Sequence, residues 1–296
     1  MDPPPEAIAN LSEPASAADA ADDIPVTVIE RRPGWRFLDL AELWRYRELL
    51  FFLTWRDVKV RYKQTALGAA WAILQPLATM IVFSLFFGRA IVTPSADVPY
   101  PLFVLSGLVP WMFFATALTS ASQSVVSNQS LITKIYFPRL LIPIGVVGAS
   151  LVDLAISLTL LMGMTLIYGV RPGLGILVVP ILLLTLTAAV LGVGILLAGV
   201  TVAYRDFRHI VPFMVQIWML ATPSIYMPVD AWEGSLRGAL LSLNPAYGIV
   251  LNFRRGVLGG PLDIGSLTIS GIVSLGLLVG GCYYFRKVER DFADLI

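Results

Sequence analysis

The polar and charged side chains of this chain are suited to binding rather than catalysis, because its sequence lacks the residue motifs that catalytic sites need. With one cysteine, Cys282, and one histidine, His209, no disulfide can form within the chain and no Cys/His metal site is expected. No Gly-x-x-x-x-Gly-Lys-[Ser/Thr] sequence is present to hold ATP phosphates. No Gly-x-Ser-x-Gly, His-Glu-x-x-His or Ser-x-x-Lys sequence supplies a nucleophile or a base. We therefore expect a protein that is not an enzyme and binds no cofactor itself.

A basic stretch at 40–63 is the first candidate for binding, since it mixes apolar and charged side chains just before a charge-free run, residues 64–88. Several of its charges fall within about 80° of one another at 100° per residue, which predicts an amphipathic helix at the membrane surface. These are Arg45, Glu48, Arg56, Lys59 and Lys63. Arg61 lies on the other side and residues 58–63 alternate like a strand, so we predict a helix to about Thr54, a turn and a second short helix. A simple positive anchor on the cytoplasmic side explains the same bases.

The segment Ser130–Pro143, SLITKIYFPRLLIP, is the second candidate. It combines two bases, two aromatic residues and a proline: Lys134, Tyr136, Phe137, Pro138 and Arg139. An apolar and basic knob of this kind is what a soluble partner protein could grip. An amphipathic loop against lipid headgroups has the same composition, and the residues alone leave both interpretations open.

Composition places these segments in a polytopic membrane protein. Of the 296 residues, 57% are hydrophobic and 14% charged, and the mean hydropathy is +0.78, whereas soluble domains carry about 25% charged residues. A helix needs about 20 apolar residues to cross a bilayer. Six stretches satisfy this requirement: 67–91, 101–123, 142–168, 173–200, 209–228 and 264–285. The predicted fold is all-α, with six transmembrane helices.

The distribution of charge predicts the orientation of these spans. With the N-terminus inside, 16 Lys and Arg residues fall in cytoplasmic segments and five in outer segments, which favours both termini inside. Residues 1–30 hold seven acids and no base, and lack the apolar core of a secretory signal. Their Pro, Ala and Asp content predicts a disordered cytoplasmic tail.

The last outer loop, residues 229–263, is unusually apolar. Two short apolar pieces, 238–243 and 246–253, flank the break at Asn244 and Pro245. This pattern predicts re-entrant or interfacial half-helices, because irregular backbone at membrane depth must be buried in protein or line a cavity. An ordinary loop lying on the surface is the alternative.

Polar and aromatic side chains inside the spans are candidates for a transport path. Asp153 lies near the middle of the third span, where a charge is costly. Because no second intramembrane acid or Lys completes a relay, we favour a neutral or hydrogen-bonded acid between helices over a pore residue. Aromatic rings can stack on sugars and amides can bind hydroxyls, although helix packing explains any single one of them. The channel candidates are Gln75, Trp111, Phe114, Trp218 and Tyr226.

Three passages together resemble the permease subunits of ABC-type exporters for O-antigen, capsule, teichoic acid and related polymers. They are RDVKVRYKQTALGAAWAILQP (56–76), KIYFPRLLIP (134–143), and the pair TPSIYMP (222–228) and LNPAYGIVLNFRRGVLGG (243–260). The first passage and the Phe-Pro-Arg loop are the most specific, and the resemblance covers roughly residues 36–296.

The resemblance implies that two copies of the chain pair and that two separate ATPase subunits dock beneath them, holding the ATP and Mg²⁺. The loop 134–139 would be the coupling helix, the stretch 40–63 an interface or gate helix, and the half-helices around Asn244 and Pro245 would shape the exit. A lipid-linked glycan would pass between the protomers, and no nucleic acid is involved. The protein would lie in a bacterial inner membrane, with both termini cytoplasmic.

Three segments follow from this interpretation: a disordered acidic tail at 1–35, an interface or gate helix at 36–65, and a six-helix permease domain at 66–296. A related ATP-driven permease for drugs or other lipids would have the same fold and need fewer sugar-stacking aromatic residues. An ion-coupled carrier or a membrane enzyme is disfavoured, since a carrier should show paired intramembrane acids or broken repeats, and only Asp153 is offered.

Overall fold

The computed structural model describes residues 40–63, 68–88, 98–171, 173–226, 234–289 and 292, and every regular element among them is helical. The chain divides into two units, Met1–Arg36 and Phe37–Ile296, and all the described residues belong to the second. The predicted tail at 1–35 therefore lies outside the described residues.

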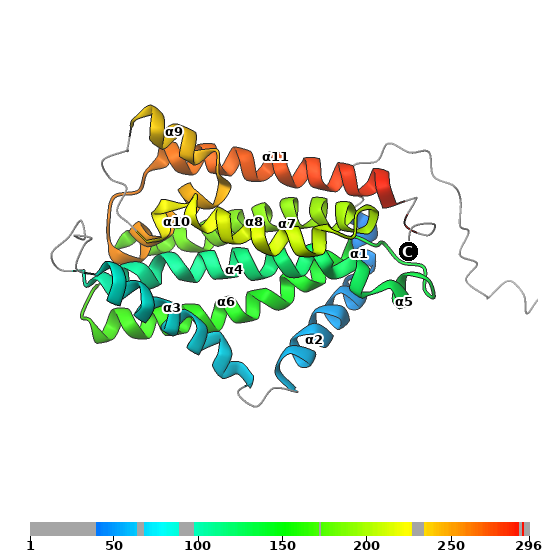
Figure 1. Cartoon of the computed structure of the whole chain (residues 1–296), viewed down its shortest axis with the longest axis horizontal. Helices are drawn as coiled ribbons and strands as arrows, with labels where there is room; N and C mark the ends of the chain where they lie inside the picture. Colours follow the sequence, from blue (N-terminus) through cyan, green and yellow to red (C-terminus); the bar gives the residue numbers. More distant parts are fainter. Residues whose placement is uncertain are drawn as a thin grey trace, which may run out of the picture. The chain divides into compact units, whose positions relative to one another are not determined.

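Four helices are long and apolar enough to cross a membrane, and they coincide with four of the six predicted spans. They are α4 (Tyr100–Ser127), α6 (Leu141–Ile167), α7 (Val179–Ala203), which the short helix η2 (Leu174–Val178) precedes, and α11 (Ile264–Val288). Figure 1 shows them running along one another.

The other two predicted spans appear as shorter apolar helices, α3 (Trp71–Phe87) and α8 (Phe207–Leu220). Their 17 and 14 residues measure about 26 and 21 Å at 1.5 Å per residue, less than the roughly 30 Å of the hydrocarbon core. Pro223, which opens the short helix η3 (Pro223–Ile225), explains why α8 stops early, because the residue before a proline avoids helical geometry.

The core of the bundle lies around α4. Its residues from Leu102 to Trp111 are all buried, and it packs against α3, α6, α7, α8 and α10 (Pro245–Leu258). A helix that is apolar on all sides is expected at the centre of a bundle rather than at its edge. The central position of α4 means that its few accessible side chains mark an open side of the bundle.

Glycines set a close helix crossing between α7 and α11. A Cβ atom on Gly281 would overlap the carbonyl oxygen of Gly192, and one on Gly192 would meet the backbone of Leu277 and Leu278. Small residues let membrane helices approach until their backbones touch. The pair Gly192 and Gly281 therefore fixes how α11 lies on α7.

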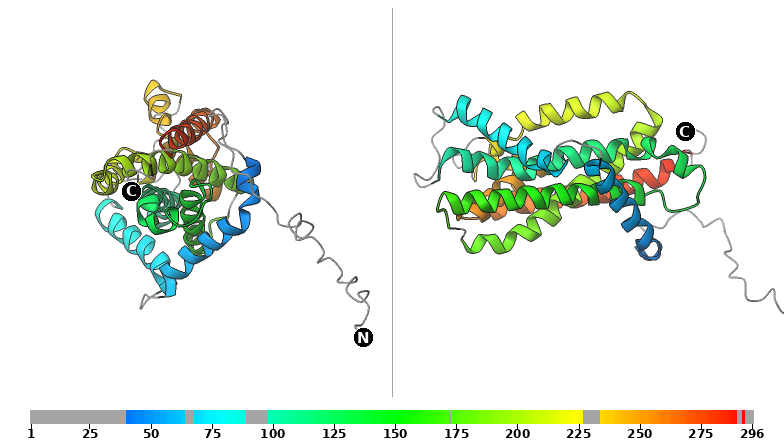
Figure 2. Two further views of the ribbon diagram at one scale, coloured as in Figure 1. Left: turned by 90° about the vertical axis from the view of Figure 1, so that its right-hand side faces the viewer. Right: turned by 90° about the horizontal axis from the view of Figure 1, so that it is seen from below.

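The short helices lie at opposite ends of the bundle (Figures 1 and 2). One end carries α1 (Leu40–Arg45), α2 (Arg47–Lys63) and α5 (Gln129–Ile132). The other end carries α9 (Leu236–Ser242) and α10. The predicted break near Thr54 is wrong: the helix is interrupted at Tyr46 and then runs without a turn to Lys63, because contacts with α6 hold both halves of α2.

The half-helices α9 and α10 meet at Asn244 and Pro245, where the sequence predicted the break. The Asn244 side chain caps α10 by accepting the backbone N–H of Ala246 at 3.1 Å, and Pro245 occupies the first helical position. Every residue of α10 from Pro245 to Val257 is buried. This part of the predicted outer loop is a packed element of the bundle, not a loop lying on its surface.

Candidate functional site

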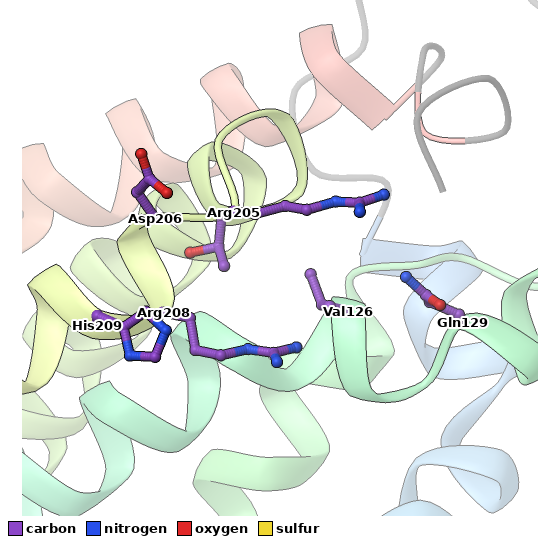
Figure 3. A pocket seen from close by; sticks show the side chains of 7 residues that line it. Val126, Gln129, Arg205, Asp206, Arg208 and His209 are labelled. Carbon is purple, nitrogen blue, oxygen red and sulfur yellow. The ribbon is translucent and has the colours of Figure 1, made fainter.

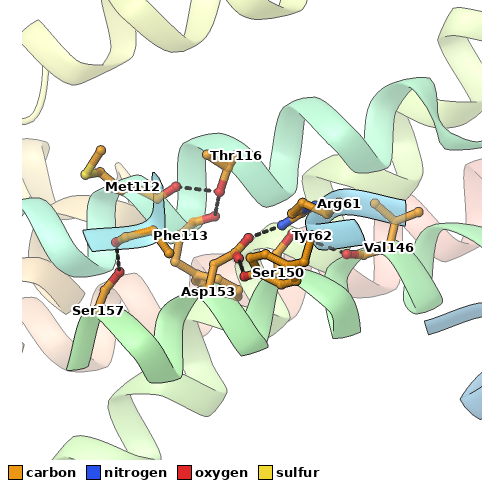
Figure 4. A network of polar contacts seen from close by, with 10 residues as sticks. Arg61, Tyr62, Met112, Phe113, Thr116, Val146, Ser150, Asp153 and Ser157 are labelled. Atoms are coloured by element: carbon orange, nitrogen blue, oxygen red, sulfur yellow. Dashed lines mark hydrogen bonds and ion pairs between the residues drawn. The ribbon is translucent and has the colours of Figure 1, made fainter. Parts of the chain in front are cut away.

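An ion pair joins the last turn of α2 to the middle of α6. The Arg61 guanidinium and the Tyr62 hydroxyl both donate to the Asp153 carboxylate, one to each oxygen (Figure 4). Asp153 retains 23% of its side-chain exposure and Arg61 32%. An intramembrane acid is stabilised when such donors satisfy its oxygens. Asp153 is thus hydrogen-bonded between helices, as favoured from the sequence, but sequence reasoning did not connect it to Arg61.

The other predicted bases of the interface helix have different surroundings. Arg56 pairs with its neighbour Asp57 at 2.8 Å and also donates to Asn128 at the end of α4, at 2.9 Å. Arg45, Lys59 and Lys63 are exposed. The exposed surface of α2 also carries aromatic residues: Phe51, Phe52 and Trp55. Bases beside aromatic rings are typical of a helix at a lipid–water boundary.

The predicted coupling loop divides into an exposed tip and a buried base. Lys134, Ile135 and Tyr136 are exposed, Tyr136 by 73%, whereas Phe137 is only 6% exposed and Pro138 is buried. Phe137 packs into a cluster with residues of α2, α6, α7 and α11. The tip can meet a partner, while Phe137 holds the loop on the bundle.

Arg139 connects this loop to the C-terminal end of α11. Its backbone N–H donates to the Glu289 carboxylate at 3.3 Å, and its guanidinium donates to the Glu289 carbonyl. The guanidinium carbon of Arg139 also lies 5.7 Å from the centre of the Phe292 ring. Arg286 lies 3.8 Å from Glu289 and 3.7 Å from Glu42 of α1. One charged cluster therefore joins the loop, α11 and α1.

Burial raises the pKa of the Glu289 carboxyl, although the charges of Arg286 and Arg139 and the backbone hydrogen bond from Arg139 act against that rise. The side chain keeps 18% exposure. The cluster is thus sensitive to the protonation of one carboxyl, a feature that no sequence motif indicated.

Three predicted site residues form one network at the C-terminal end of α8. The Trp218 indole N–H donates to Asn244 at 2.8 Å, and the Asn244 amide donates to Thr222 at 2.8 Å. Trp218 also meets the Phe114 ring edge-on, with centroids 5.0 Å apart. The network ties the end of α8 to the start of α10.

The remaining channel candidates differ in how accessible they are. Trp111 is 3% exposed and Phe114 fully buried, so neither ring offers a face to a sugar in this chain. Tyr226 donates from its hydroxyl to the Leu220 carbonyl at 3.0 Å. Gln75 on α3 is exposed. Of these candidates, Gln75 alone presents an exposed amide, and it has no side-chain hydrogen bond within the described part of the chain.

A polar stripe on α4 is a grouping that sequence reasoning missed, although its member Gln123 is one of the amides in the spans that could bind hydroxyls. Its accessible or half-buried members recur at intervals of three and four residues, which places them on one face: Thr116, Ser120, Gln123 and Ser127. The Gln123 amide donates to the Arg208 carbonyl at the start of α8, at 3.3 Å. Gln216 on α8 is also exposed. The 4-3-4 spacing was visible in the sequence, but only the burial of the rest of α4 distinguishes this face.

Arg254 is a buried cation that the sequence assigned to an outer loop. It donates to the Phe103 carbonyl at 3.2 Å, to the Ser106 hydroxyl at 3.3 Å and to the Ile225 carbonyl at 2.8 Å. Its guanidinium carbon lies 3.7 Å from the centre of the Phe103 ring. Arg254 therefore fixes α10 against α4 and η3.

Comparison with known proteins gives a consistent result. The ABC-2 type transporter family matches residues 48–256. The chain is 30% identical to the O-antigen export system permease protein RfbA of Myxococcus xanthus over 259 residues, which cover 87% of this chain and 98% of that protein. It is 27% identical to the RfbA protein of Klebsiella pneumoniae (84% and 95% covered) and 24% identical to the polysialic acid transport protein KpsM of Escherichia coli (79% and 91% covered).

Proposed function

Because this chain belongs to the ABC-2 type transporter family, we propose that it is the permease subunit of an ATP-driven exporter that moves a lipid-linked polysaccharide across a bacterial inner membrane. The observation that carries this proposal is the similarity to an O-antigen export permease over 98% of that protein's length. The chain contains no phosphate-binding loop sequence, so ATP and Mg²⁺ belong to separate ATPase subunits, two per exporter.

All six apolar helices cross the membrane in this proposal. The short helix η1 (Gly68–Ala70) leads directly into α3, and together they reach about 31 Å. The helix α8 is too short to cross alone, and η3 continues its path. Bases at the ends of the helices support the orientation: Lys134, Arg139, Arg205, Arg208, Arg286 and Lys287 lie at the end that carries α1 and α5, which is therefore cytoplasmic, as are both termini.

The helices α9 and α10 form a re-entrant pair at the outer end. The burial of α10 among α4, α7 and α11 supports this proposal, since backbone that turns within the membrane must be enclosed by protein. Side chains also form hydrogen bonds with the backbone N–H groups at the turns. Asn244 caps α10, and Asn252 accepts the Asp263 N–H at 2.8 Å where the chain leaves the pair. Asn244 and Pro245 shape the exit of the path.

The glycan passes between two copies of this chain, along the polar stripe of α4. Exposed amides and hydroxyls are poorly suited to lipid but can exchange hydrogen bonds with sugar hydroxyls and water. The exposed Gln75 of α3 and Gln216 of α8 lie on the two shorter helices that pack against α4. We assign the paired interface to the exposed faces of α3, α4 and α8 that carry these residues.

The ATPase subunits grip the exposed tip, Lys134, Ile135 and Tyr136. Movement of the tip reaches α11 through Arg139 and Glu289, and reaches α1 through Arg286 and Glu42. The helix α2 follows α1 after a single residue and is held to α6 through Asp153. This chain of contacts allows ATP hydrolysis to move α1 and α2, which act as an interface or gate helix at the cytoplasmic entrance.

A permease for drugs or other lipids is the alternative with the same fold. The names of the relatives favour a polysaccharide, since the M. xanthus and K. pneumoniae proteins are O-antigen permeases and the E. coli protein transports polysialic acid.

Deletion of the gene in its host, followed by fractionation of lipid-linked glycan, tests the proposal. Polymer trapped in the cytoplasm beneath an undecorated surface, with both defects reversed by a plasmid copy, is the expected result. The plasmid copy that carries Tyr136→Ala should restore the protein but not the surface polymer. Normal surface glycan and no trapped polymer, in a host without a second copy, would contradict glycan export.

A further inference from the structure

A basic pocket opens at the cytoplasmic end of the bundle, between the end of α4, α5 and the turn from α7 to α8. It has a volume of about 390 Å³ and is lined by Val126, Gln129, Thr201, Arg205, Asp206, Arg208 and His209. Figure 3 shows the Arg205 and Arg208 side chains extending in the same direction, toward Val126 and Gln129, while Asp206 points away from them.

The two arginines keep their guanidinium groups available. Both are exposed, and within the described ranges neither lies within ion-pair distance of a carboxylate. Thr201 is a poor ligand because its hydroxyl already donates to the Leu197 carbonyl at 2.7 Å. The pocket thus offers two guanidinium forks, the Gln129 amide and the His209 imidazole, opposed by a single carboxylate at Asp206.

Paired guanidinium groups have the geometry that phosphate oxygens require. Each can place two N–H groups on two oxygens of one phosphate, and a diphosphate can engage both arginines at once. A carboxylate ligand would satisfy one fork only. The chemistry of the pocket therefore favours a phosphate or diphosphate group.

The position of the pocket indicates a ligand that belongs to the membrane. The apolar candidate span that includes α7 ends at Ala203, two residues before Arg205, so the pocket lies at headgroup depth. From the pocket onward, α8 exposes apolar side chains along its length, including Phe213, which is 63% exposed, and Ile217, which is 51% exposed. A molecule with a phosphate head and apolar chains would meet both surfaces.

We propose that this pocket binds the phosphate group of an anionic amphiphile, with Arg205 and Arg208 as its principal ligands and Gln129 and His209 as further donors. Two sources share this chemistry: a phospholipid headgroup, and the diphosphate of a polyprenyl carrier. The first source is independent of the proposed function, and the second rests on it.

The single histidine makes the test direct, because His209 is the only source of an imidazole signal in the chain. The full chain, purified through a tag without histidine, is placed in nanodiscs of neutral phosphatidylcholine. Inorganic diphosphate, phosphatidylglycerol and polyprenyl diphosphate are then titrated separately while the histidine NMR signal and binding heat are recorded. We expect a saturable shift with at least one of these ligands.

Arg205→Gln and Arg208→Gln should each weaken binding by about tenfold, since each removes charge-assisted hydrogen bonds. Lys287→Gln, an exposed base at the same end of the bundle, should leave the affinity unchanged, and all variants should keep the wild-type melting temperature. Equal binding by phosphatidylglycerol and polyprenyl diphosphate supports a general headgroup site. Arginine-dependent preference for polyprenyl diphosphate supports a carrier site.

Binding that survives in the double arginine variant, that falls equally in Lys287→Gln, or that shows no saturation with any of the three ligands would overturn the proposal. Such a failure is distinct from a failure of the proposed function, because the gene deletion tests export without reference to this pocket.

Discussion

A single carboxylate, Asp153, determines how the surface helix α2 meets the bundle. It receives hydrogen bonds from both Arg61 and Tyr62, and Thr54 of α2 lies close to Gly148 of α6, where a Cβ atom would lie 3.2 Å from the threonine side chain. The contact combines charge with close backbone approach, so it constrains the angle of α2 as well as its position.

Asp153→Asn should lower the free energy of unfolding by about 1–2 kcal/mol, because an amide accepts weaker hydrogen bonds from Arg61 and Tyr62 than a carboxylate does. A double-mutant cycle with Arg61→Gln, read from denaturation of the purified protein, should show coupling above about 0.5 kcal/mol. Additive effects would contradict the ion pair. Complete loss of export by a fully folded Asp153→Asn protein would instead favour a role in the pore.

Glu289 makes the charged cluster that joins the loop, α11 and α1 dependent on pH. Because burial raises its pKa above the ordinary value of about 4.3, the folded protein holds the proton more tightly than the unfolded chain. The stabilisation is therefore complete below the ordinary value and is lost as the pH rises through the raised one.

Glu289→Gln should reduce the fall in melting temperature between about pH 4 and pH 7, since glutamine retains an acceptor for Arg139 without a buried charge. The measurement is a series of thermal unfolding curves on the full chain. Glu48→Gln, on the exposed surface of α2, serves as the control and should keep the wild-type pH profile. Identical pH profiles for Glu289→Gln and the wild type would show that Glu289 does not control this dependence.

At the scale of elements, the loop 134–139 has an exposed tip, which we propose meets the ATPase, and a buried base that holds it on the bundle. Ile135 and Tyr136 are 55% and 73% exposed, whereas Phe137 anchors the loop at 6% exposure. The sequence placed these residues in one motif, whereas their burial in the structure separates the exposed Ile135 and Tyr136 from the buried Phe137.

The double variant Ile135→Ala and Tyr136→Ala should lose export and the coupling of ATP hydrolysis to it while retaining the wild-type melting temperature. Phe137→Ala should instead cost about 3–5 kcal/mol of stability, as expected when a buried ring is removed. Export assays and thermal unfolding of the same preparations distinguish the two cases. Full export by the double variant would exclude this tip as the docking surface.

The crossing of α7 and α11 can be tested with two adjacent glycines. Gly281→Ala should lower stability by about 1–3 kcal/mol, because the new methyl group would overlap the backbone of Gly192. Gly280→Ala is the matched control, since a Cβ atom there would meet nothing within 4 Å. Chemical denaturation of both variants gives the comparison, and equal stabilities would contradict the close crossing.

At the scale of the whole molecule, the proposed path predicts which side of the bundle is accessible to water. With Cys282 replaced by Ala, cysteines introduced at Thr116 and Ser120 should react with a membrane-impermeant maleimide when export is active. A cysteine at Leu275 of α11, which is 62% exposed, should remain unlabelled because the proposal places that side against lipid. Labelling at Leu275 without labelling on α4 would place the path elsewhere.

The sequence by itself determined the class of the protein and the location of its helices. Long apolar runs predict spans because lipid leaves backbone groups no partner outside a helix, and α4, α6, α7 and α11 fall where these runs lie. The break at Asn244 and Pro245 was equally local, since a capping side chain followed by a proline starts a helix in any context. The same local reasoning failed for α2, whose continuity past Thr54 depends on contacts with α6.

Only the tertiary structure decided which side chains act together. Arg61 and Asp153 are 92 positions apart and Arg139 and Glu289 are 150 apart, and no periodicity links residues at such separations. The same limit applies to Trp111 and Phe114, because the sequence places them within a span but cannot say which side of it is enclosed. Hydrophobicity specifies that a helix enters the membrane, whereas the packing of its neighbours specifies which of its faces remains free.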